Sequence, residues 1–249
     1  MLFRSAVRTA IAYPLTNRFR TGMTLAMIAI VVFALTMMSV MNSNFDRLFL
    51  NEANFGGWDV EVRENPNNAI SGGLQEALAT SDPPVNTSEF DTVGSLGIAR
   101  PFGAELCQPD VSDCEDPEEF KLYMVKGADA LFLEQTTLPF QARASGFESD
   151  RAVWEALAGD STLAVINHGA LEDDFFNFGG GNLFNLKGLK EDVRSFDPVT
   201  IEVRDSASGT TEAVRLIGIL RMGAGGGGDP VSGFAGLITS RELDRKSVV

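Results

Sequence analysis

The longest apolar stretch of the chain lies near its N-terminus, where no charged side chain occurs between Thr21 and Asn44. As an α-helix, residues 22–41 would span about 30 Å, which is the thickness of the hydrocarbon core of a bilayer. Apolar residues fall on every face of this helix, unlike those of an amphipathic helix that lies on a soluble core. The pattern therefore predicts a transmembrane helix over residues 21–43.

Two other interpretations of this stretch are a buried helix of a soluble protein and a cleaved signal peptide. A buried helix seldom needs so long an uncharged run. A signal peptide has a shorter apolar segment followed by small residues in an A-x-A-like pattern, which Ser39-Val40-Met41 matches poorly. A membrane anchor is therefore the preferred interpretation.

Helical character continues after the anchor, from residue 42 until Gly56-Gly57. Beyond these glycines, alternation of apolar and polar residues predicts several strands. The predicted strands cover residues 58–64, 92–100, 119–126, 161–167, 199–205, 212–220 and 236–240. Short helices are predicted over residues 71–84 and 151–159, the second capped by Ser149. Segments 199–205 and 212–220 form the securest pair, an antiparallel hairpin. Helices and strands that alternate irregularly around such a hairpin predict an α+β domain.

The distribution of charge predicts how the anchor is oriented. Four arginines precede the apolar stretch, without any acidic residue: Arg4, Arg8, Arg18 and Arg20. Arginine-rich flanks stay inside the cell, so we expect residues 1–20 to form a cytoplasmic juxtamembrane segment. Subtracting these four from 20 basic residues leaves 16 against 34 acidic ones, a net charge of −18. We therefore expect residues 44–249 to form an extracytoplasmic domain at the plasma (cytoplasmic) membrane, with no nucleic-acid partner.

The two cysteines, Cys107 and Cys114, lie seven positions apart in a polar segment typical of a surface loop. Outside the cytoplasm such a pair can form a local disulfide, and the sequence leaves open whether it does. A zinc site is disfavoured because the chain has one histidine, His168. Acidic residues surround the cysteines: Asp110, Asp113, Glu115, Asp116, Glu118 and Glu119. Because they lack the ligand spacing of an EF-hand loop, we expect solvated carboxylates rather than a calcium site.

Motifs for catalysis and nucleotide binding are missing from the sequence. The glycine-rich stretches at Gly179 and Gly225 lack the Lys-Ser/Thr of a P-loop, and no G-x-S-x-G elbow occurs. The aromatic run FFNFGGGNLFNL, residues 175–186, either lines an apolar groove or packs as a plug in the core. We expect no enzyme and no cofactor, and an anchored hydrolase that uses His168 is a minor alternative.

The order of these segments resembles the FtsX-like/MacB-type ABC transporter permeases of bacteria. The resemblance extends over nearly the whole chain and rests on segments spread along it: AYPLTNRFRTGMTLAMIAIVVFALTMMSV, WDVEV, VKGADALFLEQ, GFESDRAVWEALAGDSTLAVIN, VTIEVRD, VRLIGIL and GLITSRELD. In that family a membrane helix leads into a large extracytoplasmic α+β domain, which returns to the bilayer. The resemblance implies a fragment that holds the first transmembrane helix and most of the MacB-like domain, truncated at its C-terminus.

The family also implies a function. Such a permease is not an enzyme itself. It pairs with a separate ATP-binding cassette subunit, works as a homo- or hetero-dimer of permeases in the lipid bilayer, and couples ATP hydrolysis to movement of its outer domain. Export, lipoprotein handling and envelope signalling are the functions implied. The alternative from a different class is a single-pass membrane-anchored binding or sensor domain.

Overall fold

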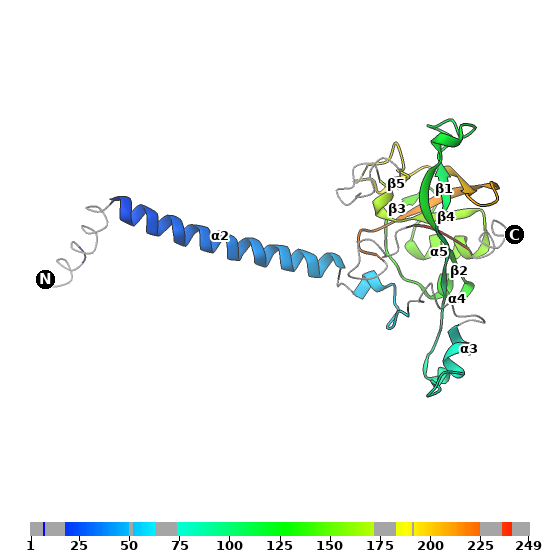
Figure 1. Ribbon diagram of the computed structural model, residues 1–249, viewed down its shortest axis with the longest axis horizontal. Coiled ribbons are helices and arrows are strands. Elements are labelled where there is room, and N and C mark those ends of the chain that lie inside the picture. The colour runs from blue at the N-terminus through cyan, green and yellow to red at the C-terminus, as the bar shows by residue number, and fades with distance from the viewer. Residues whose placement is uncertain are drawn as a thin grey trace. The chain divides into compact units, whose positions relative to one another are not determined.

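The computed structural model describes residues 7, 18–49, 52–62, 74–171, 183–190, 192–224 and 236–240, and the chain divides into two units, Met1–Arg47 and Leu48–Val249. Helix α2 (Arg18–Phe49) accounts for nearly all described residues of the first unit (Figure 1). The predicted transmembrane segment lies inside it. Two polar side chains of α2 are satisfied on the helix itself, because Thr24 Oγ1 donates to the Arg20 carbonyl (3.0 Å) and Thr36 Oγ1 to the Val32 carbonyl (2.7 Å).

The second unit begins with a short 3-10 helix, η1 (Glu52–Phe55), and a turn at Gly56 and Gly57. Both glycines have positive φ angles, 66° and 82°, which other residues adopt only with strain. The turn therefore occurs where the sequence predicts the end of helical structure. Residues 58–62 follow without strand pairing, so the strand predicted there is wrong for the described residues.

Within the described residues, eight strands make up the sheet of the second unit. They are β1 (Leu96–Cys107), β2 (Lys121–Ala128), β3 (Phe140–Ala144), β4 (Leu163–Ile166), β5 (Ser195–Phe196), β6 (Val199–Asp205), β7 (Thr211–Leu220) and β8 (Leu237–Ser240). Six of them close into a barrel in the order β4-β8-β2-β1-β6-β7, because β7 also pairs with β4. Strands β3 and β5 extend the sheet from β7. Most pairs are antiparallel, and β2–β8, β3–β5 and β4–β7 are parallel.

The helices of this unit are short. They are α3 (Leu74–Ala79), η2 (Thr87–Glu89), η3 (Pro117–Glu119), α4 (Ala130–Gln135), α5 (Asp150–Gly159) and η4 (His168–Ala170). As predicted, Ser149 caps α5, and its side chain accepts a hydrogen bond from the Ala152 amide (3.2 Å). Helix α5 buries Trp154, whose Nε1 donates to the Leu138 carbonyl (3.1 Å).

The core of the second unit is formed by the strands together with α4 and α5. Its largest fully buried side chains are Trp154, Leu106, Leu133, Leu138, Leu157, Ile166, Leu171, Leu186, Ile201, Leu216, Ile217 and Ile219. Strand β4 is buried along its whole length, as its apolar sequence predicts, and β6 and β7 form the predicted hairpin. The chain thus combines one long apolar N-terminal helix with a sheet-rich domain of mixed α and β structure.

Candidate functional site

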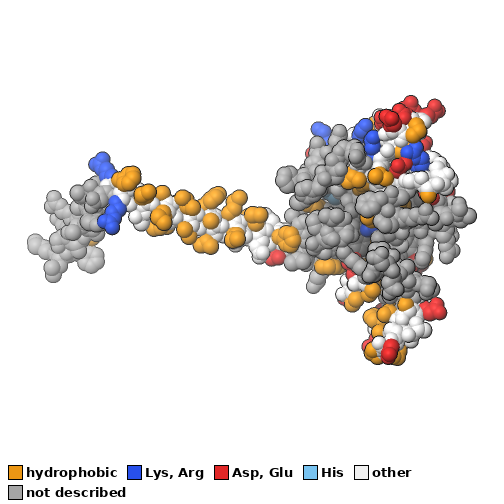
Figure 2. All heavy atoms as spheres, viewed as in Figure 1, with side chains coloured by type: hydrophobic (Ala, Val, Ile, Leu, Met, Phe, Trp, Pro, Cys, Tyr) orange, Lys and Arg blue, Asp and Glu red, His pale blue; other side chains and the backbone are white. Residues whose placement is uncertain are grey.

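The surface of α2 is the most unusual feature of the chain. Every large apolar side chain between Met23 and Met41 is more than half exposed, up to 74% at Met38. Figure 2 shows these side chains along the helix. Within the described residues, α2 is the single helix that is long and apolar enough to cross a membrane by length and composition. A core helix of a soluble protein would be mostly buried, whereas none of this apolar segment is buried.

Basic residues mark the N-terminal end of α2. Arg18 and Arg20 lie in its first turn and are exposed, while Arg4 and Arg8 lie outside the described residues. The first turn of a helix carries a partial positive charge, so acidic residues stabilise it and arginines do not. No acidic residue occurs in the first turn of α2. The dipole of α2 therefore does not favour the two arginines at this end of the helix.

A second feature is the connection between β1 and β2, which projects from the sheet at one end of β1 (Figure 1). Cys107, at the end of β1, forms a disulfide with Cys114, with a Cα–Cα distance of 5.8 Å. The next residue, Gln108, is buried and exchanges two hydrogen bonds with the backbone of Lys187: its Nε2 donates to the carbonyl (3.3 Å) and its Oε1 accepts from the amide (3.0 Å). The base of this connection is thus held covalently and by hydrogen bonds.

The acidic residues of this connection gather at its tip, as Figure 2 shows at this end of the domain. Two of these carboxylates accept hydrogen bonds from backbone amides. Asp113 Oδ1 accepts from the Glu115 amide (3.1 Å), and Asp116 Oδ1 caps η3 by accepting from the Glu118 amide (2.9 Å). In the described part of the chain, no three His, Cys, Asp or Glu side chains are placed to hold a metal ion. The tip is therefore an acidic surface.

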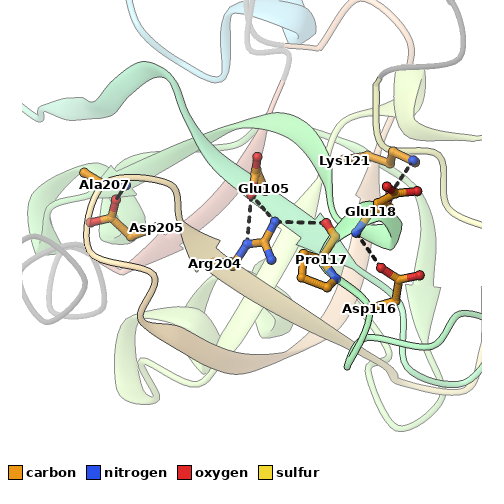
Figure 3. Close-up of polar contacts among 8 residues, drawn as sticks. All are labelled: Glu105, Asp116, Pro117, Glu118, Lys121, Arg204, Asp205 and Ala207. Atoms are coloured by element: carbon orange, nitrogen blue, oxygen red, sulfur yellow. Dashed lines mark hydrogen bonds and ion pairs between the residues drawn. The ribbon is translucent and has the colours of Figure 1, made fainter.

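Arg204 of β6 links strand β1 to the connection between β1 and β2 (Figure 3). Arg204 donates from Nε (2.8 Å) and Nη2 (2.5 Å) to Glu105 Oε2, and from Nη2 to the carbonyl of Pro117 (3.1 Å). Its guanidinium also lies 3.9 Å from the ring centroid of Phe120, a cation–π contact. Strand β1, strand β6 and helix η3 are thereby joined through one side chain. Sequence analysis missed this cluster, because Glu105 lies beyond the strand predicted over residues 92–100.

The segment that follows the long helix is held against the rest of the second unit. Asn54 is buried, and its Oδ1 accepts from Arg221 Nη2 (3.3 Å). The carbonyl of Gly56 accepts from the Thr137 amide (2.8 Å), and a Cβ at Gly56 would lie 2.7 Å from a side-chain atom of Leu138. These contacts fix the point at which the chain enters the sheet domain. The glycine pair was the one sign of this arrangement in the sequence.

The remaining candidates from the sequence do not form a catalytic arrangement in the described residues. His168 is 5% exposed and lies in η4 beside Asn167, whose Oδ1 accepts from the Tyr123 hydroxyl (2.5 Å) and from the Gly236 amide (2.9 Å). At the end of the aromatic run, Phe184 and Leu186 are in the core, which favours a core plug over a groove there. Residues 172–182 lie outside the described residues.

The turn between α5 and β4 contains a carboxyl group with a lowered pKa, that of Asp160. The side-chain hydrogen bond from Thr162 Oγ1 to Asp160 Oδ1 (2.6 Å) lowers the pKa of Asp160, and the bond from the Thr162 amide (2.8 Å) adds to this effect. Desolvation opposes the shift, and Arg215 supports it through its charge. Because this group lies in the exposed turn between α5 and β4, its role is structural.

No protein-family model, curated protein or solved structure matches this chain.

Proposed function

We propose that this chain is part of the permease subunit of an ABC transporter. In this proposal α2 crosses the plasma membrane with its N-terminus in the cytoplasm, and the sheet domain lies outside. The chain has no catalytic role. A separate ATP-binding subunit hydrolyses ATP, and a dimer of permeases passes the resulting movement to the outer domains. The resemblance of the segment order to FtsX-like/MacB-type permeases is the source of this proposal.

The observation that carries the membrane part is the exposed apolar surface of α2 between Arg20 and Asp46. Eight strongly apolar residues between Gly22 and Met41 contribute about −2.5 to −5 kcal/mol to insertion on the translocon scale. The hydroxyls of Thr24 and Thr36 donate to backbone carbonyls of the helix itself. Moving these two residues from water into lipid therefore leaves neither hydroxyl without a hydrogen-bond partner.

Two further features support the sidedness and the coupling. The disulfide between Cys107 and Cys114 is a bond that persists in extracytoplasmic compartments and is rare in the cytoplasm. The contacts of Asn54 and Gly56 hold the chain that follows the helix against the domain, so a displacement passed along the chain would reach the sheet. No ligand-binding residue is assigned, because the resemblance carries no fixed ligand motif.

A first experiment tests the membrane part. Two lysines, Ile30→Lys with Phe33→Lys, cost about 5–7 kcal/mol together on the insertion scale, more than the apolar residues supply. We expect the wild-type chain to stay in the membrane pellet after alkaline carbonate extraction and the variant to be released. Val60→Lys with Val62→Lys is the matched control, since it makes a similar change outside α2. A mature N-terminus near residue 41, found by mass spectrometry, would identify a cleaved signal peptide and reject the anchor.

A second experiment tests the sidedness. In a background where serine replaces both cysteines, a cysteine at Ser43 should react with a membrane-impermeant maleimide in intact spheroplasts. A cysteine at Thr9 should react only after lysis. The opposite labelling pattern would reject the orientation.

A third experiment tests the permease itself. The complete reading frame that contains this sequence should encode further hydrophobic spans. When its product is purified, a second protein that has a GxxxxGK[ST] motif and hydrolyses ATP should co-purify with it. A single span with no such ATPase would reject the transporter and leave the anchored binding or sensor domain.

A further inference from the structure

Residues 76–95 form an arm that projects from the sheet of the second unit (Figure 1). The arm contains most of α3, a turn and η2, and it leads into β1. None of residues 76–95 is buried, and none belongs to the core of the domain. The described contacts therefore give this segment no part in stabilising the core.

Hydrogen bonds inside the arm give it a defined shape. The Val85 amide donates to the Leu78 carbonyl (3.0 Å), which joins the turn to the end of α3. Ser81 Oγ donates to the same carbonyl (2.7 Å). At the start of η2, Asn86 Oδ1 accepts from the Ser88 amide (3.2 Å). The arm is thus a folded projection, and its side chains are held in a fixed arrangement.

The end of the arm that leads into β1 is attached to the domain. The amide of Ser95 (2.8 Å) and its hydroxyl (2.7 Å) both donate to Asp129 Oδ2, and the Asp129 amide donates to the Ser95 carbonyl (3.0 Å). Gly94 lies so close to the domain that a Cβ there would be 2.7 Å from the Trp58 ring and 2.9 Å from Phe132 Cα. A partner that bound the arm would therefore meet a prepared surface, which lowers the cost of ordering it.

The surface of the arm combines apolar side chains with carboxylates, as Figure 2 shows. Val85 is 39% and Phe90 is 41% exposed. Pro83 and Pro84 are exposed beside Val85. The charged residues of the arm are all acidic: Glu76, Asp82, Glu89 and Asp91. No Lys, Arg or His occurs between residues 76 and 95.

Charge decides what kind of partner fits this surface. Carboxylates without any basic residue repel anionic lipid headgroups and nucleic acid. The arm of a second copy would bring the same acidic residues and no base, and like charges brought together across an interface are costly. We propose that residues 76–95 are a docking surface for another polypeptide that presents Lys or Arg beside apolar side chains. Its apolar groups would cover Val85 and Phe90, and its cations would pair with the carboxylates around them.

The test places a photo-crosslinking residue, p-benzoylphenylalanine, at Phe90 in the complete reading frame that contains this sequence. This change keeps an aromatic side chain at an exposed position. After irradiation of intact cells we expect a covalent product with a second polypeptide, in which mass spectrometry finds Lys or Arg beside the crosslinked residue. The same reagent at Val85 is the second probe if the first variant fails to fold. At Val111, which is 48% exposed among acidic residues of the β1–β2 connection, it should give no such product.

Charge variants separate docking on the arm from general attraction to an acidic protein. Glu89→Lys with Asp91→Lys reverses two charges of the arm and should lower the yield of crosslinking from Phe90 about tenfold. The matched control is Glu115→Lys with Glu118→Lys, which makes the same change in net charge on the β1–β2 connection and should leave the yield unchanged. A cooperative thermal transition close to that of the wild type shows that each variant is folded.

Several results would overturn the proposal. No product from either probe on the arm, in a folded chain, would show that the arm has no partner. A product made of two copies of this chain would identify a second copy as the occupant, and a product with lipid would identify the membrane surface. Equal loss of crosslinking in both charge variants would show attraction by net charge alone. None of these results depends on whether α2 crosses a membrane or on whether the chain belongs to a permease.

Discussion

Removing the charge of Arg204 is expected to destabilise the sheet domain by about 2 kcal/mol. The side chains of Arg204 and Glu105 are 20% and 22% exposed, so this ion pair is neither fully exposed nor fully buried. Fully exposed ion pairs contribute about 0–1 kcal/mol, and disrupting a buried pair costs about 3–5 kcal/mol. The variant Arg204→Met keeps a similar volume but loses both hydrogen bonds to Glu105 and the bond to the Pro117 carbonyl. It also loses the cation–π contact with Phe120, which is worth about 1 kcal/mol.

The assay is thermal unfolding of the full chain in detergent, followed by tryptophan fluorescence. For a domain of this size, about 2 kcal/mol corresponds to a fall in Tm of roughly 4–8 °C. Arg204→Lys keeps the charge without the fork that meets Glu105, so it should lose about half as much. The matched control is Glu155→Gln, because Glu155 pairs with Arg151 four residues away on α5 while its side chain is 64% exposed. It should change Tm by less than about 2 °C.

A double-mutant cycle separates the pair from the other contacts of the arginine. The variants Arg204→Met and Glu105→Gln, alone and combined, should give a coupling free energy of about 1 kcal/mol or more. Limited proteolysis of Arg204→Met should also cut the connection between β1 and β2 faster, because Arg204 no longer holds the Pro117 carbonyl. If the melting temperature stays within 1 °C of the wild type and the coupling is zero, water screens the pair and our account of this cluster is wrong.

Three further predictions concern other parts of the domain. Replacing both cysteines with serine should cost about 2 kcal/mol, because the disulfide closes a loop of seven residues, and reducing agent should lower the Tm of the wild type but not of this variant. Gly218→Ala places a methyl carbon 2.6 Å from the buried ring of Phe140 and should cost about 1–3 kcal/mol in urea unfolding; Phe140→Leu should recover part of the loss in the double variant. Asp160→Asn keeps an acceptor for Thr162 but loses the charge. Because folding lowers the pKa of Asp160, its stabilising contribution is present above pH 3.8 and is lost as the pH falls through the folded pKa, so the small difference in Tm between variant and wild type should be present at pH 6 and shrink as the pH falls below 3.8.

Local elements were predicted well where a short pattern decides them. Ser149 and the apolar face of α5 specify that helix within ten residues, and the alternation in β6 and β7 specifies their hairpin. The helix predicted over residues 71–84 is shorter in the structure, since α3 covers Leu74–Ala79. Helix α4 was not predicted, because six residues give too little periodicity, although Asp129 caps it through the Phe132 amide (2.7 Å).

Contacts between distant segments were beyond the sequence. The barrel closes through the parallel pairs β2–β8 and β4–β7, which join strands far apart in the chain, and local alternation carries no information about such partners. The disulfide was left open for the same reason. A spacing of seven does not bring two Cα atoms to 5.8 Å; the end of β1 and the turn after it do.

The surface with the clearest functional meaning is α2, where the sequence predicts contact with lipid and the large apolar side chains are exposed in the structure. In α2 the exposed residues lie on every face, which calls for an apolar solvent rather than a single partner. Lysines at Ile30 and Phe33 should therefore change membrane extraction and leave the thermal unfolding of the sheet domain unchanged. Arg204→Met should do the reverse, and a variant that affected both would contradict the assignment of separate roles to α2 and the sheet domain.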